Sequence, residues 1–269
     1  MTSAQHSQSE LERFLRIADM AVDAAAEVLL TKFGRVEAQL KGYADFVTEA
    51  DMGAQQAVVE IIHREFPHHD FLGEEGSRGG SSQSSYRWIL DPLDGTTNYV
   101  HGVPFFAVSL ALEYEGRPIV GIIYDPMLRE RFTAVTGWGA QLNGQPIRVS
   151  HVKRLSDALV SIGLPARVVP DSVDVHWMIQ SAVHCLSIRR TGSAALNMAY
   201  LAAGRFDISW ALTTKAWDVA AGAILIEEAG GVVTGLDGQP LNAQGGPYVA
   251  AANRDLLDQF LAVVGPFRK

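Results

Sequence analysis

The segment Asp91–Asn98, DPLDGTTN, decides how this sequence is interpreted. It follows the apolar run Arg87–Leu90, RWIL, which predicts a buried strand, so both aspartates should lie at that strand's carboxyl end, where α/β sheets bind ligands. Pro92 stiffens the turn, and Gly95 lets the backbone approach a ligand closely. Two carboxylates three residues apart repel each other, and a bound cation that prefers oxygen ligands, such as Mg²⁺, would relieve that repulsion.

The same segment has a plainer interpretation. Asp, Pro and Gly are common turn residues, so on its own the segment is better explained as an Asx turn between two elements. Residues 95–97 could also open a helix, whose free N–H groups would bind phosphate. The segment therefore needs support from elsewhere in the chain.

Three further acidic segments supply that support. Gly73–Glu75 (GEE) follows the strand-like Phe71–Leu72, Trp217–Asp218 opens an apolar helix, and Asp45–Asp51 (DFVTEAD) precedes another helix. Each has an ordinary explanation as a cap or a charge that complements a helix dipole. Together, and in this order, they indicate one shared acidic site.

These segments resemble the signatures of the inositol monophosphatase family of Mg²⁺-dependent, lithium-sensitive phosphatases. The matching stretches are Asp45–Asp51, Gly73–Glu75, Asp91–Asn98, Gly192–Ala195 (GSAA) and Trp217–Gly222 (WDVAAG), and the resemblance extends from about Leu11 to the C-terminus. It implies a layered α/β/α/β/α sandwich of the sugar phosphatase type and a homodimer. It also implies hydrolysis of inositol monophosphate or a similar small polyol or sugar phosphate.

The resemblance also assigns roles to individual residues. It implies two to three Mg²⁺ ions held by Glu74, Asp91, Asp94, Asp218 and the Leu93 carbonyl. It implies a catalytic group of Glu74, Thr96 and Asp51, in which the first two position the attacking water and Asp51 bonds Thr96. It implies substrate contacts from Asp94, Gly95, Thr96, Gly192, Ser193, Ala194 and Asp218.

The charge of the proposed metal ligands agrees with this assignment independently. Glu74, Asp91, Asp94 and Asp218 carry −4 together, which two Mg²⁺ ions would neutralise, and two ions can clamp both reacting oxygens of an in-line displacement. Attack by water needs no nucleophilic side chain. The sequence contains no Cys-x₅-Arg loop, Asp-x-Asp motif, Gly-x-Ser-x-Gly elbow or Gly-x₄-Gly-Lys-Ser/Thr loop.

One position departs from the family's pattern. Inositol-handling members usually carry a glutamate seven residues before the Asp of the Trp-Asp motif, and here that position is Ala211. Broad specificity is the expected result, and histidinol phosphate, fructose 1,6-bisphosphate and 3′-phosphoadenosine nucleotides remain rival substrates. A catalytically silent binding protein on the same scaffold is the alternative from another class. Arg189 and Arg190 could attract the substrate's phosphate, but a solvated strand end is the better interpretation. His68–Asp70 is interpreted as a surface turn.

The remaining pattern predicts one layered α/β catalytic domain over 1–269, with sub-halves at about 1–150 and 151–269. Helices are expected at 11–33, 51–66, 172–183, 194–203, 219–229 and 253–264, and strands at 71–72, 88–90, 105–114, 118–124, 132–135, 158–162, 186–188, 206–210, 232–234 and 248–251. Gly76–Ser85 (GSRGGSSQSS) is predicted to be a surface loop.

Composition limits the class of protein. The chain has 269 residues, of which 48% are hydrophobic and 19% charged, with a net charge of −8 and a single cysteine, Cys185. These values exclude a disordered or fibrous protein and argue against a nucleic-acid-binding protein. Neither a signal peptide nor a run long enough to cross a bilayer is recognisable, and we expect a cytoplasmic enzyme with no membrane partner.

Overall fold

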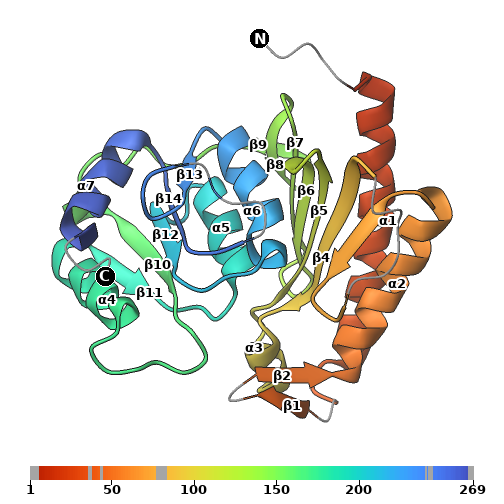
Figure 1. Ribbon diagram of the computed structural model, residues 1–269, viewed down its shortest axis with the longest axis horizontal. Helices are drawn as coiled ribbons and strands as arrows, with labels where there is room; N and C mark the ends of the chain where they lie inside the picture. The colour runs from red at the N-terminus through yellow and green to blue at the C-terminus, as the bar shows by residue number, and fades with distance from the viewer. Residues whose placement is uncertain are drawn as a thin grey trace.

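Five layers of helix and sheet form the structure, a computed structural model that describes residues 6–35, 38–42, 45–76, 84–239, 241 and 245–265 (Figure 1). For residues 38–42, 45 and 46 it describes only the backbone. Two helices, a seven-stranded sheet, two helices, a five-stranded sheet and two helices follow one another through the molecule. The predicted α/β/α/β/α sandwich is therefore confirmed.

The seven-stranded sheet is built from the first half of the chain. In spatial order its strands are β3 (Asp70–Gly73), β4 (Tyr86–Asp94), β5 (Ala107–Tyr114), β6 (Arg117–Asp125), β7 (Glu130–Val135), β8 (Gly139–Leu142) and β9 (Gln145–Ile147). Only β3 and β4 run parallel. Helices α1 (Gln8–Lys32) and α2 (Glu49–Glu65) cover the outer face. The predicted helix at 11–33 corresponds to α1, and its apolar residues from Leu11 to Leu29 face this sheet.

The five-stranded sheet comes from the second half. Its spatial order is β11 (Ser187–Arg189), β10 (Leu159–Gly163), β12 (Ile208–Ala211), β14 (Tyr248–Ala251) and β13 (Val232–Thr234). Helices α4 (Val173–His184) and α7 (Arg254–Val264) cover its outer face, and a short 3₁₀ turn at Leu155–Asp157 precedes β10. The α/β alternation predicted for this half is confirmed.

Helices α5 (Ala194–Ala202) and α6 (Ala216–Glu228) form the central layer and bury residues on nearly all sides. Small residues allow this close packing. A Cβ on Gly121 of β6 would lie 2.5 Å from Ile224 Cγ2, and one on Gly222 would lie 2.6 Å from Met198 Cβ. These glycines therefore allow α5 and α6 to pack closely against each other and against the seven-stranded sheet.

Three features differ from the predicted elements. β1 (Ala38–Gly42) and β2 (Asp45–Thr48) form a hairpin that the sequence pattern does not reveal, and β8 and β9 lie where no strand was predicted. Strand β4 also continues through Asp94, so both aspartates lie within the strand assignment and not beyond its end. Of the loop predicted at Gly76–Ser85, residues 77–83 lie outside the described part of the chain. Within the described part, no helix is long and apolar enough to cross a membrane.

Candidate active site

The end of β4 bends sharply between its two aspartates. Asp91 pairs with Ser109 of β5, but the next aligned pair is Asp94 with Ala107, because Pro92 has no N–H for the ladder. Asp91 Oδ1 accepts a hydrogen bond of 3.0 Å from the Leu93 N–H, which is the Asx turn expected from the plainer interpretation. The turn leaves both carboxylates buried in the middle of the molecule.

Gly95 ends this turn and begins α3 (Thr96–Val100), as the sequence predicted. Its φ of +95° lies in the left-handed region, and a Cβ there would lie 3.0 Å from the Phe105 carbonyl oxygen. Only glycine meets both conditions without strain. The residue therefore fixes the path of the chain beside the aspartates.

Asp94 joins the two halves of the chain. Its carboxylate accepts hydrogen bonds from the Ser193 hydroxyl, from Ala194 N at 3.1 Å and from Ala195 N at 2.9 Å, all at the start of α5. Ser193 and Ala194, predicted to contact substrate, thus have these donors engaged by Asp94. Negative charge at a helix N-terminus is favourable, which explains how one carboxylate holds α5 against β4.

Asp218 and Glu74 approach from two other elements. Asp218 lies in the first turn of α6 and accepts a 2.7 Å hydrogen bond from Lys215 N, so it also acts as a helix-capping residue. Glu74 directly follows β3, and its N–H donates to the Leu90 carbonyl at 3.2 Å. The structure therefore directs acidic residues from β3, β4 and α6 towards one region.

Burial and mutual repulsion make this region electrostatically unusual. Burial, followed by the charges of Glu74, Asp94 and Asp218, raises the pKa of Asp91 well above its usual range. Burial also raises the pKa of Asp94, against its hydrogen bonds from Ser193 and from the α5 backbone. The pKa of Asp218 rises to about 7, again chiefly through burial, although Lys215 lowers it.

These carboxylates suit a divalent cation. Among the described residues, no Lys or Arg forms an ion pair with Asp91, Asp94 or Asp218. Buried negative charges without a partner are costly, and an all-oxygen donor set matches the preference of Mg²⁺. In the described part of the chain, however, no three His, Cys, Asp or Glu side chains already form a group that could hold a metal ion. The ligand set stays a prediction.

Asp51 and Thr96 are close but only weakly connected. Asp51 Oδ2 accepts hydrogen bonds from Thr48 N at 2.8 Å and Thr48 Oγ1 at 2.6 Å, which caps α2 as the plainer interpretation of this segment predicts. The contact from Thr96 Oγ1 to Asp51 Oδ1 is 3.5 Å, whereas Thr96 Oγ1 lies 2.9 Å from the Leu93 carbonyl oxygen. The hydroxyl has one proton, so the shorter bond to Leu93 is favoured here.

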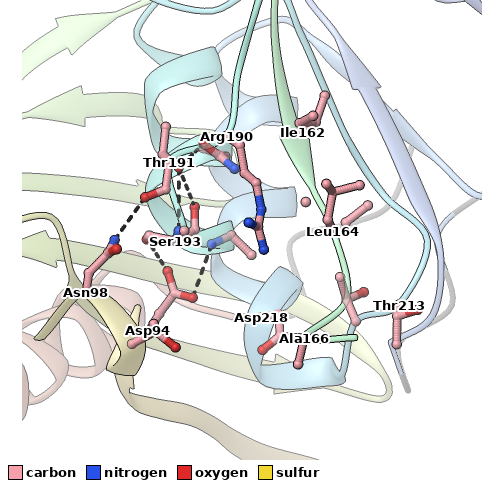
Figure 2. A pocket seen from close by; sticks show the side chains of 17 residues that line it. Asp94, Asn98, Ile162, Leu164, Ala166, Arg190, Thr191, Ser193, Thr213 and Asp218 are labelled. Atoms are coloured by element: carbon pink, nitrogen blue, oxygen red, sulfur yellow. Dashed lines mark hydrogen bonds between the residues drawn. The ribbon is translucent and has the colours of Figure 1, made fainter. Parts of the chain in front are cut away.

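A cavity of about 390 Å³ opens beside these residues (Figure 2). Asp94, Gly192, Ser193, Ala194 and Asp218 line it, so five of the predicted substrate-binding residues share one cavity. Its remaining lining residues, beyond the substrate contacts that the resemblance implies, are Thr97, Asn98, Ile162, Gly163, Leu164, Ala166, Arg190, Thr191, Asn197, Ala211, Thr213 and Thr214. The lining does not include the predicted site residues Glu74, Asp91, Leu93, Gly95 and Thr96.

Asn98 is a lining residue that the sequence analysis missed. Its Nδ2 donates to the Phe105 carbonyl at 2.8 Å and to the Thr191 carbonyl at 2.9 Å, so it ties α3 to the loop before α5. A Cβ on Gly192, whose φ is +90°, would lie 2.9 Å from that nitrogen. The position of Asn98 at the end of DPLDGTTN was the available signal.

The layered α/β fold places the carboxylates of Asp91, Asp94 and Asp218 in and beside a small cavity at the meeting point of the two halves of the chain. The inositol monophosphatase family matches residues 10–265. The chain therefore belongs to the inositol monophosphatase family.

Two relatives illustrate the range of names in this family. The chain is 39% identical over 264 residues to "Nus factor SuhB" of Pseudomonas aeruginosa, covering 95% of this chain and 97% of that protein. It is 40% identical over 258 residues to the inositol-1-monophosphatase of Rhizobium meliloti, covering 91% and 96%. The family membership is shared, while the names of the relatives differ.

Solved structures agree with the fold. The SuhB protein of Bartonella henselae has a TM-score of 0.89 at 36% identity, covering 94% of this chain and 98% of its own. The inositol monophosphatase of Anabaena has a TM-score of 0.85 at 39% identity, covering 95% and 96%. An IMPase/NADP phosphatase, solved with Mg²⁺ and phosphate, has a TM-score of 0.84 at 25% identity, covering 94% and 95%.

Proposed function

We propose that this protein is an Mg²⁺-dependent phosphomonoesterase that hydrolyses small polyol or sugar phosphates, inositol monophosphate among them. The observation that carries the proposal is a group of three carboxylates, the buried Asp91 and Asp94 and the partly exposed Asp218, whose pKa values are raised beside an open cavity. These carboxylates repel a phosphate dianion unless cations bind between the carboxylates and the phosphate. The proposed reaction follows from that requirement.

In this proposal two to three Mg²⁺ ions are held by Glu74, Asp91, Asp94, Asp218 and the Leu93 carbonyl. Bound there, Mg²⁺ supplies an activated water and neutralises the charge that develops on the phosphate and the leaving oxygen. Glu74 and Thr96 orient the water, and Asp51 supports Thr96 from α2. The backbone N–H groups of Gly95 and Thr96 orient the phosphate.

The leaving group would occupy the cavity beside Gly192, Ser193 and Ala194. Ala211 lies in its lining and has no acceptor for a ring hydroxyl. Losing one charged hydrogen bond removes roughly 1.5–3 kcal/mol of preference. We therefore propose broad specificity, in which inositol 1-phosphate is accepted without strong preference, and fructose 1,6-bisphosphate and histidinol phosphate remain the rival substrates.

The halves at about 1–150 and 151–269 act in this proposal as one catalytic domain, because Asp94 comes from the first half and Ser193 and Asp218 come from the second. The remaining proposals carry over from the family resemblance and from composition. They are a cytoplasmic homodimer, sensitivity to lithium, and no nucleic-acid or membrane partner.

A phosphate-release panel with Mg²⁺ tests the proposal. The substrates are inositol 1-phosphate, histidinol phosphate, fructose 1,6-bisphosphate and a 3′-phosphoadenosine nucleotide, each measured with Mg²⁺ and with EDTA. We expect release that requires Mg²⁺ for at least one of them. No release from any of them at saturating Mg²⁺ would instead support a binding protein on this scaffold, the alternative that relatives named Nus factor keep relevant.

A further inference from the structure

Arg190 is exposed at the end of β11, as the interpretation of a solvated strand end predicts, and its side chain also extends into the cavity. It directly follows β11 and belongs to the cavity lining. Figure 2 shows its guanidinium reaching from the loop before α5 into the space between Ser193 and Leu164, above Asp218. A cation thus faces the volume that the leaving group of a phosphate ester would occupy.

The neighbouring arginine behaves differently. Arg189 Nη1 donates to Ser187 Oγ at 2.7 Å and to the Ile188 carbonyl at 2.9 Å, and Arg189 does not line the cavity. Arg190 has no hydrogen bond or ion pair with any residue that the structure describes. Its guanidinium donors are therefore available to a ligand, and a guanidinium matches the geometry of carboxylate and phosphate oxygens.

An apolar part of the cavity wall offers little to a polyol. It consists of Ile162, Leu164, Ala166 and Ala211, and none of these has a side-chain donor or acceptor. Gly163 lies so close to Ala211 that a Cβ on the glycine would be 2.6 Å from the alanine Cβ. Ring hydroxyls held against this wall would lose water without gaining side-chain hydrogen bonds, which is unfavourable.

From this combination, we propose that Arg190 selects phosphate esters whose leaving group carries a second anionic group, a carboxylate or a phosphate, over neutral esters of the same size. The selection rests on the proposed phosphatase function and adds its substrate class. The Asp94 and Asp218 side of the cavity takes the phosphate that is transferred, with Mg²⁺, and Arg190 takes the second anion. The apolar wall covers the carbon skeleton between them.

A matched pair of esters tests this selection. In 2-phosphoglycerate a carboxylate replaces one hydroxymethyl group of glycerol 2-phosphate, so the two differ chiefly in the second charge. We expect the wild-type protein to show a kcat/KM for 2-phosphoglycerate at least about tenfold higher, equivalent to about 1.4 kcal/mol. In Arg190→Gln that ratio should fall towards one. Fructose 1,6-bisphosphate against fructose 1-phosphate repeats the comparison with phosphate as the second anion.

Arg189→Gln is the matched control, because it removes the adjacent guanidinium outside the cavity and should leave both rates and their ratio unchanged. A wild-type ratio near one, or an equal loss for both esters in Arg190→Gln, would overturn the assignment of a second anion to Arg190. Calorimetric titration of the same two esters with Ca²⁺, which uses oxygen ligands like Mg²⁺, measures the preference without turnover. Preferential binding of 2-phosphoglycerate without hydrolysis would support anion selection by Arg190 and would contradict only the phosphatase function.

Discussion

The two ends of strand β4 place ionisable side chains in opposite surroundings. At the amino end, His69 stacks on Phe66 and Tyr86 with ring centroids 4.7 and 4.5 Å apart, and its Nδ1 accepts a 3.2 Å hydrogen bond from Trp88. At the carboxyl end, Asp91 and Asp94 are buried together with no described basic side chain paired to either. The same strand therefore ends in an aromatic cluster and in an acidic one.

The amino end is arranged for stability. The buried Glu113 is paired with Arg87 at 2.6 Å, and burial lowers the pKa of His69 to about 4, which keeps the ring neutral within the stack. At the carboxyl end, burial raises the pKa values of Asp91 and Asp94, and neighbouring carboxylates raise that of Asp91 further. Hydrogen bonds act against these shifts, but no described Lys or Arg forms an ion pair with either aspartate. Groups that cost stability without local compensation are typical of functional sites. The contrast agrees with a structural role for the amino end and with the proposed metal site at the carboxyl end.

The largest expected effect is on activity, at the carboxyl end. Asp91→Asn should lower kcat with Mg²⁺ by at least ~10³-fold, because a charge that neutralises the bound cations disappears. The same change should leave the free energy of unfolding equal or higher, since it relieves repulsion with Glu74, Asp94 and Asp218 and keeps an acceptor for the Leu93 N–H. Steady-state phosphate release and urea denaturation measure both effects.

Asp125→Asn provides the control for this substitution. Asp125 is fully buried and accepts hydrogen bonds from Met127 N at 2.9 Å and Leu128 N at 3.0 Å, in a turn after β6 and outside the cavity lining. It should keep a kcat close to that of the wild type. Near-normal turnover of Asp91→Asn at saturating Mg²⁺ would remove the basis for the proposed metal site.

The next effect concerns specificity, at the wall where this chain departs from its family. We expect the kcat/KM for inositol 1-phosphate to exceed that for glycerol 2-phosphate by less than about a hundredfold, or 2.7 kcal/mol. Ala211→Glu should raise that ratio by about tenfold or more, because it restores an acceptor for the ring hydroxyls. Ala211 lines the cavity, so a carboxylate at this position would be directed towards the bound substrate.

Ala166→Glu tests whether the preference for inositol 1-phosphate depends on the position of the new carboxylate or only on its charge. Ala166 lines the same cavity from the loop after β10, so its carboxylate would enter the cavity at another angle. It should not raise the preference for inositol 1-phosphate. A wild-type preference above about a hundredfold would mean that another residue already replaces the missing glutamate.

The sequence predicted most of the fold because its signals were local. The apolar stripe of α1, the Glu115–Arg117 turn between β5 and β6, and Gly95 before α3 each depend on neighbouring residues. The β1–β2 hairpin was missed because Asp45–Thr48 also fits a capped helix entry, and Thr48 does in fact cap α2. Local capping and strand pairing use the same residues here, and only the pairing depends on a distant partner.

The candidate site was predicted less completely than the fold. Motif order identified Asp94, Ser193 and Asp218, which the structure places around one cavity. It did not show that Asp94 would bond the start of α5, and it did not distinguish Arg190, which extends into the cavity, from Arg189, which stays outside it. Those outcomes depend on how the β11–α5 loop meets β4, and they join residues almost a hundred positions apart.

Inhibition by lithium is the effect that we expect of a monovalent ion at the acidic end of β4. We expect millimolar LiCl to lower the steady-state rate of phosphate release, because a small monovalent ion that replaces one Mg²⁺ would hold the product phosphate in place. NaCl at matched ionic strength should have a smaller effect. Equal inhibition by the two salts would reduce the observation to screening of charge and would contradict lithium sensitivity.

The smallest effect is on stability, at the aromatic end. Because the folded protein lowers the pKa of His69 to about 4 from its ordinary 6.5, the contribution of the neutral ring is complete above pH 6.5 and is lost as the pH falls towards 4. We expect about 1 kcal/mol of this contribution to disappear between pH 7 and pH 5, after allowance for solvent screening of a half-buried ring. His69→Gln removes the titrating ring, so its destabilisation relative to wild type, measured by urea denaturation, should be smaller at pH 5 than at pH 7. His68→Gln, at the exposed neighbouring position, should show the same small difference from wild type at both pH values. A destabilisation by His69→Gln that does not change with pH would show that the ring contributes through packing alone.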